Sequence, residues 1–414
     1  MRHLINKVAG GALLIAGTAI GAGMLALPLS IGAAGFYNSL VSFFLSCLLM
    51  IITAFLLMEV YLWFDDEINI TTAAKRTLGR TGELIGSFAF LFLLLAVNSA
   101  YISGASELLI SLVPAFENVA KPIVGALFTS ILGVLIYFGT GPVDFINRFM
   151  MIGLFASYLT LVFLSVPYID PALYSAGDPR YLAYGWPIMV TSFAYQFVIP
   201  TLKTYMDNNA RALGWSIFIG TMIPLVFFLF WVGVILGVLP FEGIEGISSL
   251  IGTDHEVSGL SDALEAKINN PLIPNAVRLF SVFALMTSLL GVSISLCDYF
   301  ADLLHHVRPK FNSRVFVTVL ALFPCYLFTV FYPNGFMLAI RYAAIAIAIL
   351  LGILPVAMVW SGRYYKKFAK PDSFRTPGGK VTLVFALVLS IAVIVIEVLM
   401  KLDMLPVPAA PVVM

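Results

Sequence analysis

The chain has 414 residues, of which 61% are hydrophobic and 11% are charged, and its formal net charge is +1. Soluble domains carry roughly 45–50% apolar and about 25% charged residues. A soluble fold cannot bury such an excess of apolar side chains, because surface grows nearly as fast as volume. The composition therefore predicts an integral membrane protein, and the near-zero net charge argues against nucleic acid as a partner.

About eleven apolar stretches follow one another along the chain, each long enough at ~1.5 Å per residue to cross ~30 Å of hydrocarbon. We predict an all-α integral membrane protein with a single transmembrane domain that covers 1–414. The predicted spans are 8–34, 36–64, 83–113, 121–140, 148–167, 185–206, 213–239, 273–304, 313–332, 334–361 and 380–401. The three cysteines lie inside these runs without the spacing of a disulfide framework or a metal site.

The distribution of Lys and Arg predicts the orientation, since cytoplasmic loops carry the excess of both. Most of the 23 Lys and Arg residues fall on the amino-terminal side of the predicted membrane, and the other side holds only Lys121, Arg180, Lys267 and Lys401. We therefore expect the amino terminus inside and the carboxyl terminus outside. The longest outer loop, 240–271, is acidic, and we interpret it as a solvated cap rather than an ion collector.

Two predicted spans are interrupted in their middle. The first contains Gly17-Thr18-Ala19-Ile20-Gly21-Ala22-Gly23 followed by Pro28, and the sixth contains Thr191-Ser192-Phe193-Ala194-Tyr195-Gln196 followed by Pro200. Glycine and proline weaken a helix, and broken helices persist in lipid only where they line a cavity. Such breaks at corresponding places in two halves indicate a transporter's substrate site. The alternative is that these residues only allow close helix packing.

The two breaks open the first and the sixth spans, so spans 1–5 (1–167) and 6–10 (185–361) form two candidate repeats. Because five is an odd number, the second repeat must run in the opposite sense across the membrane. The sequence thus predicts a five-plus-five inverted repeat, with span 11 (380–401) as an addition.

The break in span 1 offers a way to hold a zwitterion with few charged groups. Backbone N–H groups of Gly21, Ala22 and Gly23 would lie at a helix amino terminus, which suits a carboxylate. Carbonyls released at 17–19 would accept an ammonium group or a cation. In span 6, further backbone acceptors would come from 192–196. The predicted substrate contacts from the two breaks are therefore Thr18, Ala19, Gly21, Ala22, Gly23, Ser192, Phe193, Ala194, Tyr195 and Gln196.

Span 3 carries a polar face and one of the few ionisable groups inside a span. Ser99, Ser103 and Ser106 recur at helical spacing and are as typical of close helix packing as of a cavity. Asn98 lies beside this face and is a candidate substrate contact. Glu107 is a candidate proton carrier, because charged groups in lipid are functional candidates by default. Glu59 and Glu397 lie near helix ends, where we expect them to reach the interface.

Several runs resemble the hydroxy/aromatic amino acid permeases of bacteria, in order and over nearly the whole chain. The matching runs are Ala16-Gly-Thr-Ala-Ile-Gly-Ala-Gly-Met-Leu-Ala-Leu-Pro28, Ala100-Tyr-Ile-Ser-Gly-Ala-Ser-Glu-Leu108, Asp144-Phe-Ile-Asn-Arg148, Tyr205-Met-Asp-Asn208, Thr287-Ser-Leu-Leu-Gly291 and Asp298-Tyr-Phe-Ala-Asp302. Within this family, which is part of the amino acid/auxin permease superfamily, the chain most resembles the tyrosine-specific branch. In span 6 it departs from the Gly-aromatic-His-Gly type sequence and reads Ala194-Tyr195-Gln196-Phe197.

This resemblance implies the leucine-transporter-type fold and cation-coupled import of an amino acid across the bacterial inner membrane. It also implies that Tyr101 closes over the substrate. In the fold class, a Thr–Ser pair matching Thr287 and Ser288 binds sodium together with span-1 carbonyls, here of Gly17 and Ile20. Ser288 is a candidate substrate contact as well. Hydroxyl and carbonyl oxygens are suitable ligands for a hard cation, although a helix-packing pair is an equal interpretation.

Three functional classes compete on these observations. We predict a proton-coupled importer of an aromatic amino acid, with tyrosine first and sodium coupling, or tryptophan, phenylalanine or serine as substrate, as alternatives. A channel would need a polar lining or rings of charge, and an enzyme would need paired catalytic groups at membrane depth; neither pattern is present in the sequence. We expect no cofactor besides the coupling ion, and as partners an amino acid and the lipid bilayer without an obligate protein.

Overall fold

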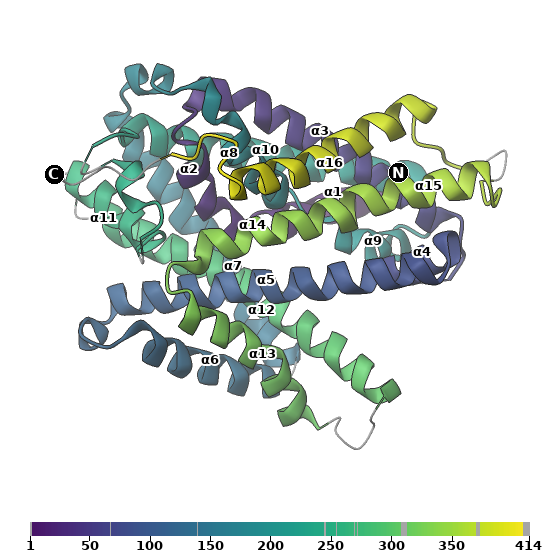
Figure 1. The fold of residues 1–414 in the computed structure, drawn as a ribbon, viewed down its shortest axis with the longest axis horizontal. Helices are drawn as coiled ribbons and strands as arrows, with labels where there is room; N and C mark the ends of the chain where they lie inside the picture. Colours follow the sequence, from purple (N-terminus) through teal and green to yellow (C-terminus); the bar gives the residue numbers. More distant parts are fainter. Residues whose placement is uncertain are drawn as a thin grey trace.

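The computed structural model describes residues 2–66, 68–138, 140–243, 246–253, 255–268, 270, 272–307, 313–369 and 373–408. These residues form helices and connecting turns without a β-strand, as expected of an all-α integral membrane protein (Figure 1). Nine of their helices are long and apolar enough to cross a membrane. The bent pair Asn6–Ala19 and Ala22–Ile31 forms a tenth candidate span, with a 50° change of direction.

Each predicted span coincides with one helix or with a pair of helices. In the first half these are α1 (Arg2–Ala19) with α2 (Ala26–Ile31), α3 (Phe36–Leu62), α5 (Arg80–Leu112), α6 (Lys121–Tyr137) and α7 (Thr140–Ser165). In the second half they are α8 (Leu182–Ser192) with α9 (Ile199–Tyr205), α10 (Ala210–Val238), α12 (Leu272–Val307), α13 (Arg314–Phe331) and α14 (Gly335–Ile347) with α15 (Leu354–Tyr364). The last span is α16 (Gly379–Lys401).

Several details differ from the predicted boundaries. Helix α7 begins eight residues before the predicted start of span 5, and α6 has only 17 residues, about 26 Å at 1.5 Å per residue. The tenth span contains a π-helical segment, η9 (Ala348–Ile353), between α14 and α15. Two short helices outside the predicted spans are α4 (Ile70–Leu78) and α11 (Ser258–Lys267). Both lack the apolar length that predicts a span.

The helices form two groups with the middle of the molecule between them. Helices α1, α2, α3, α8 and α10 pack on one another, as do α5, α6, α12 and α13. Figure 1 shows α3, α8 and α10 above and α6, α12 and α13 below, while α14 contacts both α5 and α8. We call the end of the molecule with α4 and the start of α1 the amino-terminal face, and the end with α11 the opposite face (Figure 1).

Two buried ion pairs join helices that are distant in sequence. Glu59 of α3 is fully buried and accepts hydrogen bonds from Arg363 Nε at 2.7 Å and from the Thr376 N–H at 2.7 Å. Glu397 of α16 pairs with Arg341 of α14 at 3.1 Å. The expectation that both glutamates reach the interface is therefore wrong. A buried charge needs a partner because its desolvation costs several kcal/mol, and residues distant in sequence supply one in each case.

The outer loop covers the opposite face and is held to α5 by a buried carboxylate. Glu107 Oε1 accepts hydrogen bonds from the Val257 N–H (2.7 Å), the Ser258 N–H (2.6 Å) and the Ser258 hydroxyl (3.0 Å). Glu256 accepts hydrogen bonds from the N–H groups of Gly252 and Met337 at 3.0 and 3.1 Å. The loop is thus packed into the protein through buried polar contacts and is more than a solvated cap.

The Glu59–Arg363 pair leads to a stability prediction. Arg363→Met should lower the free energy of unfolding by about 3–5 kcal/mol, because it leaves the Glu59 carboxylate buried without a counter-ion. Denaturant unfolding of the purified protein in detergent would measure the loss. The matched control is Arg180→Met, since Arg180 is exposed in its ion pair with Asp178 and should have little effect. Equal stability of both variants would contradict the prediction.

The outer loop should be held more firmly against the helices at acidic pH than at neutral pH. Burial raises the pKa of Glu256 to about 7 from an ordinary 4.5, against the lowering effects of the Met337 and Gly252 N–H groups and of the Lys121 and Arg341 charges. A carboxyl whose pKa is higher in the closed loop stabilises closure most below pH 4.5, and this contribution is lost as pH rises through about 7.

Hydrogen exchange of 246–253 and 255–268, corrected for intrinsic rates, should therefore increase between pH 5.5 and 8. The opening equilibrium can change by at most about tenfold per pH unit for one proton. Glu256→Gln should flatten this dependence, whereas Glu265→Gln, an exposed residue of the same loop, should retain it. An unchanged pH dependence in Glu256→Gln would show that another group is responsible.

Candidate functional site

The first span breaks at an extended glycine. Helix α1 ends at Ala19, and Gly21 has φ −165° and ψ −155° before the short 3-10 helix η1 (Ala22–Leu25) continues into α2. The break turns the Ala22 N–H outward, where it donates a hydrogen bond to Ser288 Oγ of α12 at 3.0 Å. In η1, the Met24 carbonyl accepts a hydrogen bond from Trp231 Nε1 at 2.9 Å. Residues of two other helices therefore bind backbone groups next to the break.

The sixth span breaks after Ser192, and its chain resumes in the 3-10 helix η6 (Gln196–Val198) before α9. Gln196 accepts a hydrogen bond from the Tyr195 N–H at 3.0 Å and donates to the Met50 carbonyl and to Thr53 Oγ1, both at 3.2 Å. This side chain therefore holds the break against α3. The Tyr195 hydroxyl accepts a hydrogen bond from Thr221 of α10 at 2.7 Å.

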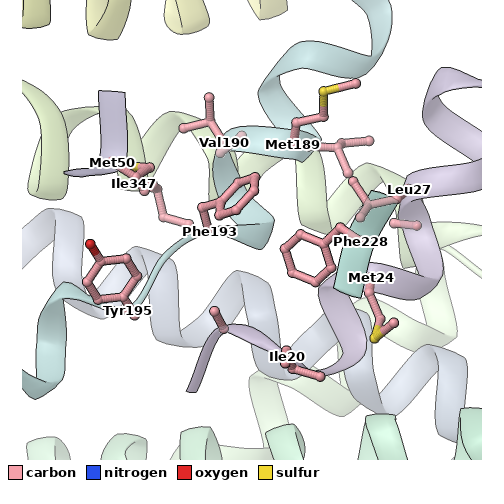
Figure 2. Packing of buried hydrophobic residues seen from close by; sticks show 14 of the residues in the cluster. Ile20, Met24, Leu27, Met50, Met189, Val190, Phe193, Tyr195, Phe228 and Ile347 are labelled. Carbon is pink, nitrogen blue, oxygen red and sulfur yellow. The ribbon is translucent and has the colours of Figure 1, made fainter. Parts of the chain in front are cut away.

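The two breaks lie against each other, as their matched positions in the sequence predict. Ser192 Oγ is 3.2 Å from the Gly23 carbonyl and 3.0 Å from the Ile188 carbonyl of its own helix. Figure 2 shows buried side chains from both broken spans, with Phe193 and Phe228 adjacent to each other in a cluster that also contains Ile20 and Met24. The rings of Phe193 and Phe228 are 5.1 Å apart, edge to face.

A cavity of about 420 Å³ lies between the two breaks and the helices α5, α7 and α12. Its volume falls within the range of roughly 300–1,000 Å³ that is usual for small-molecule sites. The predicted residues that line it are Gly17, Thr18, Ala19, Gly21, Gly23, Tyr101, Ser192, Ala194, Thr287 and Ser288. The remaining predicted residues, Ile20, Ala22, Asn98, Glu107, Phe193, Tyr195 and Gln196, are not part of the lining.

Three of these exceptions have clear structural roles elsewhere. Asn98 accepts a hydrogen bond from Ser293 at 2.6 Å and donates one to the Leu94 carbonyl at 2.8 Å, so it connects α5 to α12. Glu107 binds the outer loop, as described above. Phe193 is fully buried against Phe228. Asn98 and Phe193 are therefore corrected from substrate contacts to packing residues, and Glu107 lies apart from the cavity.

Thr287 and Ser288 of α12 both line the cavity, and their hydroxyl groups have different hydrogen-bond partners. Thr287 donates a hydrogen bond to the Phe283 carbonyl of its own helix at 2.8 Å. Ser288 accepts the Ala22 N–H and also interacts with the Tyr101 hydroxyl. Thr287 and Gly17 both line the cavity, and their hydroxyl and carbonyl oxygens are of the kind that a hard cation prefers. Ser288 is in addition a structural partner of the break.

The predicted site residues did not include the apolar part of the lining or three polar residues, Asn147, Thr191 and Ser295. The additional residues are Phe90, Leu93, Leu94, Val97, Asn147, Met151, Thr191, Phe197, Val198, Gly291, Val292, Ser295 and Ile347. Most belong to helices without a break, where an apolar residue that lines a cavity looks the same in sequence as one that packs. Three of them did carry a sequence signal, since Asn147 and Gly291 lie in runs that resemble the permeases and Thr191 begins the polar run at the span-6 break.

Aromatic residues lie beside the cavity in two places. Next to the break in span 6, the buried rings of Phe193 and Phe228 pack edge to face, and the Trp231 ring lies 4.6 Å from that of Phe280. Toward the amino-terminal face, a hollow of about 550 Å³ shares Phe90 and Phe197 with the cavity. These two rings are 5.9 Å apart, and they lie where the cavity meets this second hollow.

Broken helices around a cavity within a multi-pass helical fold define a membrane transporter by class. Residues 4–397 match the Tryptophan/tyrosine permease family, and the chain belongs to this family. It is 33% identical to the Tyrosine-specific transport system 1 of Haemophilus influenzae over 97% of this chain and 99% of that protein. It is also 32% identical to Tyrosine-specific transport system 2 of the same organism (98% and 100% covered) and 30% identical to the Tryptophan-specific transport protein of Pseudomonas aeruginosa (96% and 95%).

The family match confirms the predicted resemblance to bacterial aromatic amino acid permeases and the prediction that the chain is not an enzyme. It also agrees with a multi-pass membrane protein that transports amino acids. The departure at Gln196 now has a structural explanation, since this residue holds the break against α3.

The geometry at Gly21 leads to a prediction about packing. From the sequence we expect Gly21 and Gly23, but not Gly11, to exclude bulky side chains. The structure contradicts the Gly11 expectation, because a Cβ there would lie 2.6 Å from Met206 and 2.9 Å from Ser216. A Cβ at Gly21 would overlap Ser288 Oγ, whereas one at Gly23 would make an ordinary 3.4 Å contact with Ser192.

Gly21→Ala should therefore destabilise the detergent-solubilised protein by about 1–3 kcal/mol, the usual cost of overpacking, and Gly23→Ala should be milder. Thermal unfolding would measure both variants. The double variant Gly21→Ala/Ser288→Ala should recover part of the loss, because the next nearest atom, Ser288 Cβ, would lie at an acceptable 3.5 Å. A Gly21→Ala variant as stable as wild type would disprove the close contact.

Proposed function

We propose that this protein is a secondary active transporter that imports an aromatic amino acid, with tyrosine as the preferred substrate, by proton symport. The observation that carries the proposal is the cavity formed where the two broken spans meet, with Ser192 Oγ 3.2 Å from the Gly23 carbonyl. Its apolar lining on α5, α7 and α12 suits an aromatic ring. Of the three relatives described above, two are named as tyrosine-specific and one as tryptophan-specific.

The proposed architecture is eleven spans, with α6 counted despite its length, in a five-plus-five inverted repeat of the leucine-transporter type. The first repeat is 1–167, the second is 185–361, and 380–401 is an addition to a single domain. Breaks in the first span of each repeat support this division, as does the contact between them. The amino terminus is proposed to lie in the cytoplasm and the carboxyl terminus outside, in the inner membrane, on the basis of the Lys and Arg distribution.

In this arrangement the substrate carboxylate approaches the break at Gly21 and Gly23, and its ammonium group approaches the carbonyls near Ala19 and Ala194. Both groups are held by backbone dipoles at broken helices, so that a zwitterion can bind without a charged side chain. Alternating access then consists of movement between the two helix groups. The hollow beyond Phe90 and Phe197 would be the path to the cytoplasm.

Protons are the proposed coupling ion, and sodium at Thr287 and Gly17 is the alternative. Neither has a mid-membrane charged residue in the described cavity lining to identify it. Glu107, whose carboxyl lies in span 3 outside the lining, is the proposed proton carrier. The two coupling ions can be distinguished by the sodium dependence of uptake. With a proton gradient present, uptake requires sodium only if sodium is the coupling ion.

The test is uptake of tyrosine, tryptophan, phenylalanine and serine by the purified protein in liposomes, under separate proton and sodium gradients. Inward proton gradients should drive tyrosine accumulation in sodium-free buffer, and a protonophore should abolish it. Thr287→Ala should reduce uptake several-fold without creating a sodium requirement. A strict sodium requirement of the wild type would overturn proton coupling, and uptake of serine alone would overturn the aromatic substrate.

A further inference from the structure

Asn147 is a polar residue of the cavity lining that has no assigned partner. It lies on α7, and its side-chain Oδ1 is buried without a hydrogen bond to any described residue. A buried amide oxygen without a donor costs roughly 1–3 kcal/mol. Native structures rarely keep such a group unless a ligand, an ion or water completes it.

The hydroxyl groups of the other polar residues in the lining each take part in a hydrogen bond within the protein. Thr18, Thr191, Ser192, Thr287 and Ser295 each donate to a backbone carbonyl at 2.8–3.2 Å, with Leu14, Pro187, Gly23, Phe283 and Gly291 as acceptors. Tyr101 and Ser288 interact with each other. Asn147 therefore differs from the rest of the described polar lining, because its buried amide oxygen has no hydrogen-bond donor, whereas each hydroxyl oxygen already takes part in a hydrogen bond.

Asn147 lies on a wall of the cavity that suits the ring of an amino acid rather than its backbone. In the proposed binding mode, the two broken spans hold the carboxylate and ammonium groups of the substrate through backbone dipoles. The walls formed by the unbroken helices α5, α7 and α12 are left for the ring. On α7 the described lining consists of Asn147 and Met151, so the Asn147 carboxamide belongs to this side of the cavity.

We propose that the Asn147 carboxamide accepts a hydrogen bond from the ring of the substrate and thereby selects tyrosine and tryptophan over phenylalanine. This inference rests on the proposed function. Tyrosine carries a phenol O–H and tryptophan an indole N–H, whereas phenylalanine has no ring donor. A site built around a hydrogen bond discriminates strongly against an analogue that lacks the donor, because the buried protein group is then left unpaired.

The variant that tests this role is Asn147→Leu, which has a similar volume and cannot form a hydrogen bond. Affinities of the purified protein in nanodiscs would be measured for tyrosine, tryptophan, phenylalanine and 4-fluorophenylalanine, which approximates the size of tyrosine without its donor. The matched control is Ser157→Ala on the same helix, outside the cavity lining, whose hydroxyl bonds the Gly153 carbonyl.

The wild type and Ser157→Ala should bind tyrosine at least about tenfold more tightly than phenylalanine or 4-fluorophenylalanine, which corresponds to about 1.4 kcal/mol. In Asn147→Leu, tyrosine and tryptophan should lose about tenfold or more, while phenylalanine should keep or gain affinity. The ratio of tyrosine to phenylalanine affinity is the decisive quantity, because misfolding or general weakening would change both ligands together.

An unchanged ratio in Asn147→Leu would overturn the proposal. An equal loss for all four ligands with a shifted proton or sodium dependence would also overturn it and would assign Asn147 to the coupling ion. Failure of the proposed function looks different, since the wild type would then bind none of the aromatic ligands. That result would overturn both the role of Asn147 and the proposed transport of an aromatic amino acid.

Discussion

The structure depends on one constraint, namely that backbone groups released by a broken helix must find partners in an apolar interior. Each unpaired group costs several kcal/mol where water is absent. Ser288 accepts the Ala22 N–H, Ser192 lies against the Gly23 carbonyl, and Trp231 donates to the Met24 carbonyl. These partners come from α12, α8 and α10. The break in span 1 can therefore exist only when three other helices surround it, and a cavity remains where their side chains do not meet.

The charged groups inside the protein are used to hold helices together at a distance from this cavity. Glu59 and Arg363 connect α3 to α15, and Arg341 and Glu397 connect α14 to α16. Glu107 binds the outer loop. Every described residue that lines the cavity is uncharged. A net-neutral amino acid can enter such a site without leaving an unpaired charge, provided that backbone dipoles receive its two ionic ends.

Aromatic side chains are unevenly distributed around the cavity. The rings of Phe193, Phe228, Trp231 and Phe280 form buried contacts beside the break in span 6, whereas Phe90 and Phe197 line both the cavity and a second hollow. In the proposed alternating-access cycle, the boundary between the two helix groups is where this packing would change.

The sequence by itself determined the membrane class, the approximate positions of the long apolar helices and the two breaks, because apolar length and the backbone effects of Gly and Pro are local properties. It also predicted that Thr287 and Ser288 matter at the site. Only the tertiary structure decided which groups meet. Ser288 bonds Ala22, which is 266 residues away in the sequence, and Gln196 bonds α3. Glu59 pairs with Arg363, and Asn147 lines the cavity. Such pairings depend on how distant helices pack, and one sequence contains no local signal for that packing.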